Sequence, residues 1–136
     1  MIQGFLENFS LDVEPFTLTP NVDLMYKNPQ HQQIFNRLLY QLETGNSLLV
    51  VSGEVGTGKT LLCRKLLYAL ESHFSTAYIP NPAAVRKNLS AAIAADLGVS
   101  GTSVEDEFAI FDSINRKLVE NIDNKKPTVL VIDEAQ

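Results

Sequence analysis

The chain has 136 residues, of which 45% are hydrophobic, so it can bury one sizeable core and is too apolar for a disordered segment. Its formal net charge of −5 gives it no electrostatic reason to bind nucleic acid or an anionic membrane surface. A single cysteine excludes an intrachain disulfide. The N-terminus lacks the regions of a signal peptide, and no apolar run is long enough to span a membrane, which predicts a soluble, cytoplasmic chain.

The first residues differ in composition from the rest of the chain. Residues 1–27 contain several prolines and aromatic side chains, which predict an irregular arm outside the main domain of residues 28–136. Three aromatic side chains of this arm are expected to pack on the domain: Phe5, Phe9 and Phe16. A helix should follow, because Asn28 can cap it, Pro29 suits its first turn and Gly45 can end it.

After this helix, extended and helical segments are expected to alternate. The apolar run at 48–51 is too short for a helix and predicts a buried strand, and the run at 128–132 predicts another. A further strand is expected at 76–79. Helical spacing and cap residues predict three helices between these runs. The first extends from the glycine-rich loop to about His73, and the second covers 83–97 and ends at Gly98. The third begins at a capping box formed by Thr102 with Glu105 or by Ser103 with Asp106. The alternation predicts an α/β domain with a mostly parallel sheet.

The loop between the first strand and its helix contains the strongest motif of the chain. Gly53, Gly58, Lys59 and Thr60 match the phosphate-binding pattern G-x-x-x-x-G-K-[ST], with Gly56 as an extra glycine. In this pattern Lys59 reaches the β and γ phosphates, and the Thr60 hydroxyl is a Mg²⁺ ligand. The residues expected to bind the nucleotide are Gly53, Glu54, Val55, Gly56, Thr57, Gly58, Lys59, Thr60 and Leu61. The plainer interpretation, a glycine turn with a solvent-exposed lysine, is disfavoured by the predicted strand and helix on either side.

Two acidic residues follow the last predicted strand. Ligands of open α/β sheets bind outside the carboxyl ends of the strands, so Asp133 should face the same crevice as Lys59 and Thr60. Asp133 is expected to hold Mg²⁺, and Glu134 to polarise a water molecule for attack on the γ-phosphorus. Two acids at a strand end are often only a solvated terminus, but the neighbouring phosphate-binding loop favours the functional interpretation.

Several segments also resemble one family. "GEVGTGKTLLCRKLL", "TAYIPNP" and "VLVIDEAQ", preceded by "PFTLTPN" and "HQQIFNRLLYQL", resemble AAA+ ATPases of the general secretion pathway protein A group. Within this group the likeness is to members that serve biogenesis of the mannose-sensitive haemagglutinin type IV pilus. The resemblance implies that Lys59 and Thr60 belong to the Walker A motif, that Asp133 is the Walker B aspartate, and that Glu134 is the catalytic glutamate. By the same resemblance, Tyr26 and His31 fall on the adenine side of the pocket.

The resemblance implies a P-loop NTPase fold of the AAA+ type, with a parallel sheet flanked by helices, and ATP with Mg²⁺ as ligands. It also implies a hexamer in the full-length protein, acting with pilus or secretion proteins at the inner membrane. The chain stops at Gln136, two residues past the residue that matches the catalytic glutamate, so we expect the domain to be truncated after the Walker B strand. By itself the chain is expected to lack ATPase activity. In this class another strand lies between the strands at 48–51 and 128–132, and it is missing from the sequence given. We therefore expect a gap between these two strands, direct pairing of the two, or a strand borrowed from another molecule.

Two other classes of function remain open at this point. One is a DNA-linked ATPase that resembles transposition helpers, although the acidic composition disfavours it. The other is a nucleotide-gated binding module with little turnover. Small-molecule kinases share the loop, but Glu134 next to Asp133 favours a water nucleophile over a bound acceptor.

Overall fold

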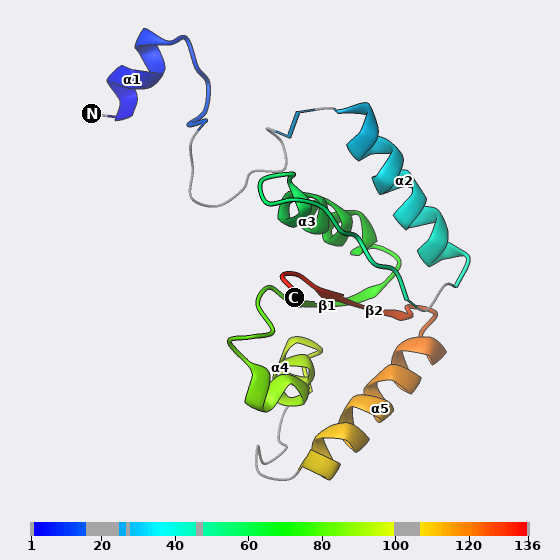
Figure 1. Cartoon of the computed structure of the whole chain (residues 1–136). Helices are drawn as coiled ribbons and strands as arrows, with labels where there is room; N and C mark the ends of the chain where they lie inside the picture. The colour runs from blue at the N-terminus through cyan, green and yellow to red at the C-terminus, as the bar shows by residue number, and fades with distance from the viewer. Residues whose placement is uncertain (1, 16–24, 27, 46–47, 100–106, 136) are drawn as a thin grey trace.

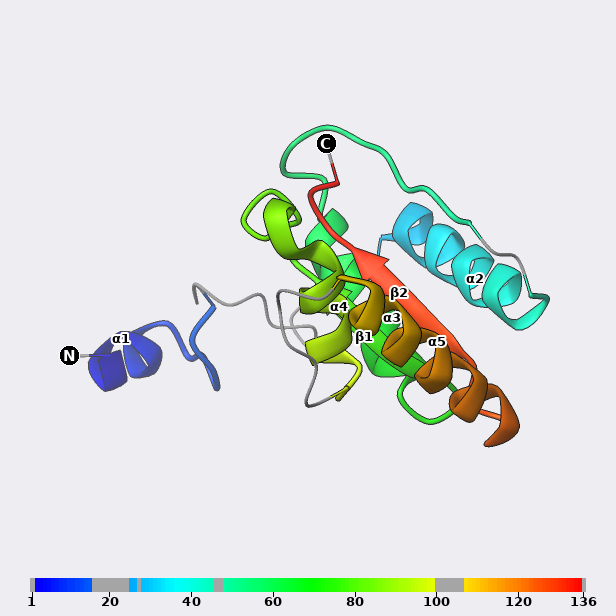
Figure 2. The same cartoon turned by 90° about the horizontal axis from the view of Figure 1, so that it is seen from below.

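The computed structural model describes residues 2–15, 25–26, 28–45, 48–99 and 107–135. Two strands, β1 (Ser75–Ile79) and β2 (Thr128–Ile132), pair in parallel at the centre. Helices cover both faces of this pair, α2 and α3 on one side and α4 and α5 on the other (Figures 1 and 2). The predicted α/β architecture with a parallel sheet flanked by helices is therefore confirmed.

Helices α2 (Pro29–Glu43) and α3 (Lys59–Leu70) form the layer on one face of the sheet. Their buried apolar side chains make one cluster with neighbours from the sheet: Phe35, Leu62, Leu66 and Leu70, with Leu38, Leu39, Leu42, Ala69, Phe74 and Val129 against them. The Lys65 ammonium also lies 4.6 Å from the centre of the Phe35 ring, a cation–π contact between the two helices. These contacts fix α3 between α2 and the sheet.

The start of α2 follows the signals in its sequence. Asn28 Oδ1 accepts a hydrogen bond from the Gln30 N–H at 2.9 Å. Pro29 occupies the first turn, where the backbone N–H that proline lacks would have no partner within the helix. The helix ends at Glu43, two residues before Gly45. The predicted helix and its cap are confirmed.

The alternation of side chains along the strands decides which residues face α3. Val129 of β2 packs in the α2–α3 cluster and is paired in register with Thr76. Since side chains alternate between faces, Tyr78, Val131 and the following Asp133 also point toward α3. The opposite face of β1 carries buried Ala77 and Ile79.

The apolar run at 48–51 is not the buried strand that its sequence predicted. Its backbone forms no strand, and the side chains of Leu48 and Val50 are 83% and 82% exposed. Among the described residues only β1 and β2 pair, and this run therefore has no neighbour with which to exchange backbone hydrogen bonds. Of the arrangements expected for 48–51 and β2, direct pairing is wrong, because the described residues of this run pair with no strand.

The helix expected over 83–97 is shorter than predicted. A turn comes first, in which Asn81 Oδ1 accepts the Ala84 N–H at 3.3 Å, followed by a 3-10 turn, η2 (Arg86–Asn88). The α-helix α4 (Leu89–Asp96) begins only after these turns and ends before Gly98. The hydrogen bond from the Ala84 N–H to the Asn81 side chain competes with helix formation at the start of this segment. The apolar pattern of the sequence does not reveal this competition.

The last helix, α5 (Glu107–Asp123), leads into β2 and matches the predicted element. The capping boxes proposed for its start lie outside the described residues. At its other end Asn121 is buried, and its Nδ2 donates to Thr128 Oγ1 at 2.9 Å, which ties the helix to the first residue of β2.

The N-terminal arm contains a short helix, α1 (Ile2–Asn8), where an irregular segment was expected. The rings of Phe5 and Phe9 contact each other, with centroids 4.9 Å apart, and their side chains are 40% and 66% exposed. α1 lies apart from the other helices (Figure 1), so these two rings do not pack on the domain as expected. Phe16 lies outside the described residues, and the division of the chain at residue 27 stays a prediction.

None of the helices in the described ranges is long and apolar enough to cross a lipid bilayer.

The core between α3 and the sheet should depend strongly on Leu70, whose side chain is 2% exposed. Leu70→Ala removes buried methyl groups and leaves a cavity, which should lower the free energy of unfolding by about 2–5 kcal/mol. Val119→Ala, at a residue 58% exposed on α5, is the control and should change it by less than about 0.5 kcal/mol. Urea unfolding measures both, and similar effects of the two variants would contradict this description of the core.

Candidate functional site

The glycine-rich loop enters α3 through residues in the left-handed region of backbone conformation. Gly56 has a φ of 81°, and Gly58, the residue before the first turn of α3, has a φ of 82°. Side chains are strained in this region, so the motif needs glycine at both positions. The first amides of α3 have no partner within the helix, and they lie beside a loop that has little side-chain cover. This arrangement favours an anion.

The side chain of Lys59 folds back over the loop. Its Nζ donates to the carbonyl oxygens of Gly53 at 2.9 Å and Glu54 at 2.8 Å. The Thr57 hydroxyl donates to the same Glu54 carbonyl at 2.8 Å, which closes the loop into a ring of hydrogen bonds. An ammonium group has three donors, so Lys59 can bind a phosphate oxygen while it keeps these two bonds.

His31 and Tyr26, the two residues assigned to the adenine side, differ in position. A side-chain carbon added at Gly58 would lie 3.4 Å from His31 Cε1, so α2 brings this imidazole against the loop. The Tyr26 side chain is 82% exposed. His31 therefore lies beside the phosphate-binding motif, whereas Tyr26 is mostly exposed.

Asp133 is buried at the end of β2, with 6% of its surface exposed. Its backbone N–H donates to the Ile79 carbonyl at 2.9 Å and thereby extends the parallel pairing by one bond. Both carboxylate oxygens accept hydrogen bonds, Oδ2 from the Tyr78 hydroxyl at 3.3 Å and Oδ1 from the Glu134 N–H at 3.0 Å. A buried carboxylate is costly without such partners, so these bonds stabilise its position.

Electrostatic effects locate Asp133 next to α3. Burial raises the pKa of the Cys63 thiol, and the negative charge of Asp133 raises it further. Cys63 lies three residues after Thr60 on the same helix, so the two residues share a face of α3. Asp133 therefore faces the part of α3 around Cys63, about one turn after the predicted metal ligand Thr60.

Tyr78 belongs to the same group of side chains. Burial raises the pKa of its hydroxyl, and the Asp133 carboxylate adds to the rise through its charge and its hydrogen bond. The hydroxyl therefore remains protonated at neutral pH and can donate to Asp133. No motif in the sequence points to Tyr78, because only the pairing of β1 with β2 brings it to Asp133.

Glu134 has a different environment from Asp133. Its φ of 50° is in the left-handed region, where a residue with a side chain is strained, so the chain turns sharply just after the strand. Glu134 is exposed, whereas Asp133 is buried. The buried carboxylate suits a metal ligand, and the exposed one has access to water.

The predicted site residues lie at one end of the molecule. Figures 1 and 2 both show the loop that precedes α3 at the end of the fold where β2 finishes. In the described ranges no group of three or more His, Cys, Asp or Glu side chains could hold a metal by itself. Mg²⁺ does not need such a cage, because it keeps several waters and is bound by one or two protein groups plus substrate phosphates. Thr60 and Asp133 fit this kind of binding.

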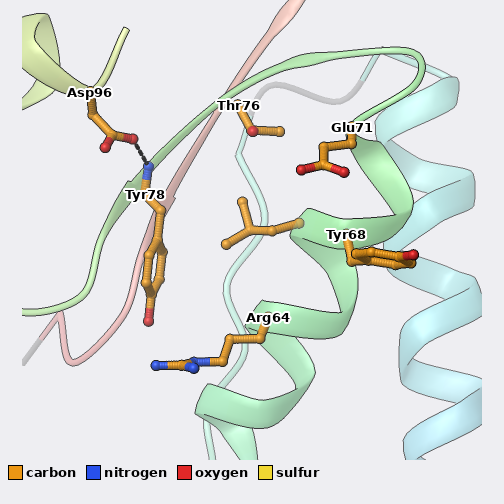
Figure 3. Close-up of a pocket in the computed structure, with 7 residues that line it drawn as sticks. Arg64, Tyr68, Glu71, Thr76, Tyr78 and Asp96 are labelled. Carbon is orange, nitrogen blue, oxygen red and sulfur yellow. Dashed lines mark hydrogen bonds between the residues drawn. The ribbon is translucent and has the colours of Figure 1, made fainter. Parts of the chain in front are cut away.

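A separate groove of about 420 Å³ lies along β1 (Figure 3). Side chains of α3 and the residue after it, β1 and α4 line it: Arg64, Leu67, Tyr68, Glu71, Thr76, Tyr78 and Asp96. No residue of the phosphate-binding motif contributes to it, so it is distinct from the candidate nucleotide site. Tyr78 is common to both, since its hydroxyl reaches Asp133.

Comparisons with known proteins agree with this geometry. Residues 41–136 match the family of AAA domains. The chain is 33% identical over 132 residues to general secretion pathway protein A of Aeromonas hydrophila, an alignment that spans 97% of this chain and 24% of the relative. The chain thus spans about a quarter of the length of that relative, and no solved structure matches it. Because residues 41–136 match the family model and helices cover both faces of a parallel sheet, the chain belongs to the AAA domain family, with homology to general secretion pathway protein A.

Proposed function

We propose that the chain is the nucleotide-binding part of an ATPase, which binds Mg·ATP through the loop from Gly53 to Leu61 and hydrolyses ATP in the full-length protein. The observation that carries this proposal is the loop itself. Two glycines in the left-handed region, Gly56 and Gly58, leave it open in front of the first amides of α3. The Lys59 ammonium, bonded to two loop carbonyls, brings a positive charge to the same place. Polyphosphate is the ligand with matching charge and size.

Each residue then has a defined role. Lys59 binds oxygens of the β and γ phosphates, while the Thr60 hydroxyl and the Asp133 carboxylate hold Mg²⁺, directly or through its waters. When bound, Mg²⁺ supplies positive charge that neutralises the phosphate oxygens. Glu134 accepts a proton from the water that attacks the γ-phosphorus, a role for which its exposure beside the buried Asp133 is suitable.

The biological role is inferred from the relative. Its name assigns it to the general secretion pathway, and we propose that this chain serves a related process, assembly of type II secretion or type IV pilus machinery, including the mannose-sensitive haemagglutinin pilus. In this proposal the full-length protein acts as a hexamer, in the cytoplasm and peripheral to the inner membrane. The negative net charge disfavours the DNA-linked alternative.

The role of Lys59 predicts a specific loss of affinity. Lys59→Ala removes a charge-assisted contact with the phosphates and should weaken binding of Mg·ATP at least about tenfold, as measured by calorimetric titration of the full-length protein. Lys87→Ala, at an exposed lysine of η2, is the matched control and should bind like the wild type. Equal affinities for the wild type and Lys59→Ala would contradict the site.

The role of Glu134 predicts a loss of turnover without a loss of binding. Glu134→Gln removes the base but keeps the size of the side chain, so steady-state ATP hydrolysis should fall about 100-fold or more while Mg·ATP affinity stays the same. Glu43→Gln, at an exposed glutamate that ends α2, should leave both quantities unchanged. Hydrolysis at the wild-type rate in Glu134→Gln would mean that another group is the base.

The role of Asp133 predicts a change in the metal dependence of binding. Asp133→Asn removes the negative charge that attracts Mg²⁺, so added Mg²⁺ should strengthen ATP binding less than in the wild type. Binding in the presence of EDTA should not weaken. Asp112→Asn, which breaks only an exposed ion pair with Arg116 on α5, is the control for a lost carboxylate. The assignment fails if both variants respond to Mg²⁺ like the wild type.

A further inference from the structure

The Asp133 carboxylate is held at both oxygens by groups from different parts of the chain. Oδ1 accepts the N–H of the next residue, Glu134, at 3.0 Å, and Oδ2 accepts the Tyr78 hydroxyl at 3.3 Å. The first partner is local and follows from the turn after β2. The second comes from β1, and among the described residues Tyr78 is the only side-chain donor to this carboxylate. Rotation of the carboxylate would break both bonds.

Tyr78 is itself held in place at two points. Its backbone N–H donates to Asp96 Oδ2 at 2.6 Å, which ties the edge of β1 to the end of α4 (Figure 3). Its hydroxyl end points toward the guanidinium of Arg64 on α3, whose charge acts on it. The pairing of Tyr78 with Val131 sets its position relative to β2, so the hydroxyl comes to Asp133 from a fixed direction.

We propose that Tyr78 is a positioning residue for Mg²⁺ at this site, because its hydroxyl holds the Asp133 carboxylate in the orientation that receives the metal of Mg·ATP. This inference rests on the proposed function and adds to it a residue outside the two nucleotide motifs. Each carboxylate oxygen can accept more than one hydrogen bond or ligand, so the Tyr78 hydroxyl and a metal-bound water do not exclude each other. Mg²⁺ requires nearly ideal octahedral geometry, which makes its binding sensitive to carboxylate orientation.

A purely structural role for the hydroxyl has a different consequence. The ring of Tyr78 would keep its packing in Tyr78→Phe, and only stability would change. A positioning role instead changes the response to metal while it leaves metal-free nucleotide binding intact. The two roles are therefore separated by measurements of binding with and without Mg²⁺, without any measurement of turnover.

The experiment compares Tyr78→Phe with Tyr68→Phe in the full-length protein. Tyr68 lines the same groove from α3 but is 77% exposed, so Tyr68→Phe also removes a tyrosine hydroxyl but leaves the bond to Asp133 intact. A fluorescent ATP analogue is titrated in EDTA and at increasing Mg²⁺, and Mn²⁺ is titrated by electron paramagnetic resonance. In Tyr78→Phe the metal concentration for half-maximal effect should rise about three- to tenfold, with unchanged affinity in EDTA. Tyr68→Phe should match the wild type in both measurements.

Three results would overturn the inference, and they are distinguishable. If Tyr78→Phe has the wild-type metal dependence, the hydroxyl does not position the carboxylate, and the proposed function stands. If Tyr78→Phe loses affinity equally with and without metal, its role is structural. If the wild type binds neither the analogue nor Mn²⁺ with it, the proposed function fails and this inference fails with it.

Discussion

The parallel pairing of β1 with β2 is the constraint on which the candidate site depends. Parallel strands end at the same edge of a sheet, so the end of β1 with Tyr78 and the end of β2 with Asp133 must lie together. The bond from the Asp133 N–H to the Ile79 carbonyl continues this pairing into the site itself. A shift of one residue in the register would turn Asp133 to the opposite face, away from α3.

The packing of α3 is the second requirement. Its buried leucines face α2 and the sheet, and they orient the helix so that its first turn lies at the same end as the carboxyl ends of the strands. The glycine-rich loop can then present its backbone where Asp133 and Glu134 emerge. The cluster around Leu66 and Leu70 is thus a structural support for the loop as well as a core.

The site separates two neighbouring carboxylates by environment. Asp133 is buried and satisfied by hydrogen bonds from Tyr78 and from the backbone, whereas Glu134 follows at a strained turn and is exposed. A buried, oriented carboxylate suits a metal, because its position does not depend on solvent. An exposed carboxylate next to it suits contact with water. The left-handed φ of Glu134 is consistent with the strain often found at functional sites.

Local signals in the sequence predicted much of this chain. Asn28 and Pro29 began α2 as expected, and the leucine spacing predicted α3. The apolar run at 128–132 forms the strand β2 as predicted, but this strand is not buried as expected, since Leu130 and Ile132 are 41% and 38% exposed. These features depend on local signals, such as cap residues and apolar periodicity, so they can be predicted without knowing which distant segments pack together. The predicted roles of Lys59 and Glu134 are of the same kind, since they follow from a motif, and they stay predictions.

By itself the sequence determined the α/β class, the position of the glycine-rich loop and the acidic pair at the end of the last strand. Only the tertiary structure decided that 48–51 stays unpaired and exposed, because an apolar run becomes a strand only when another strand supplies hydrogen bonds. It also decided that Tyr78 reaches Asp133. These residues are 55 positions apart in the chain, and strand register, a long-range property, brings them together.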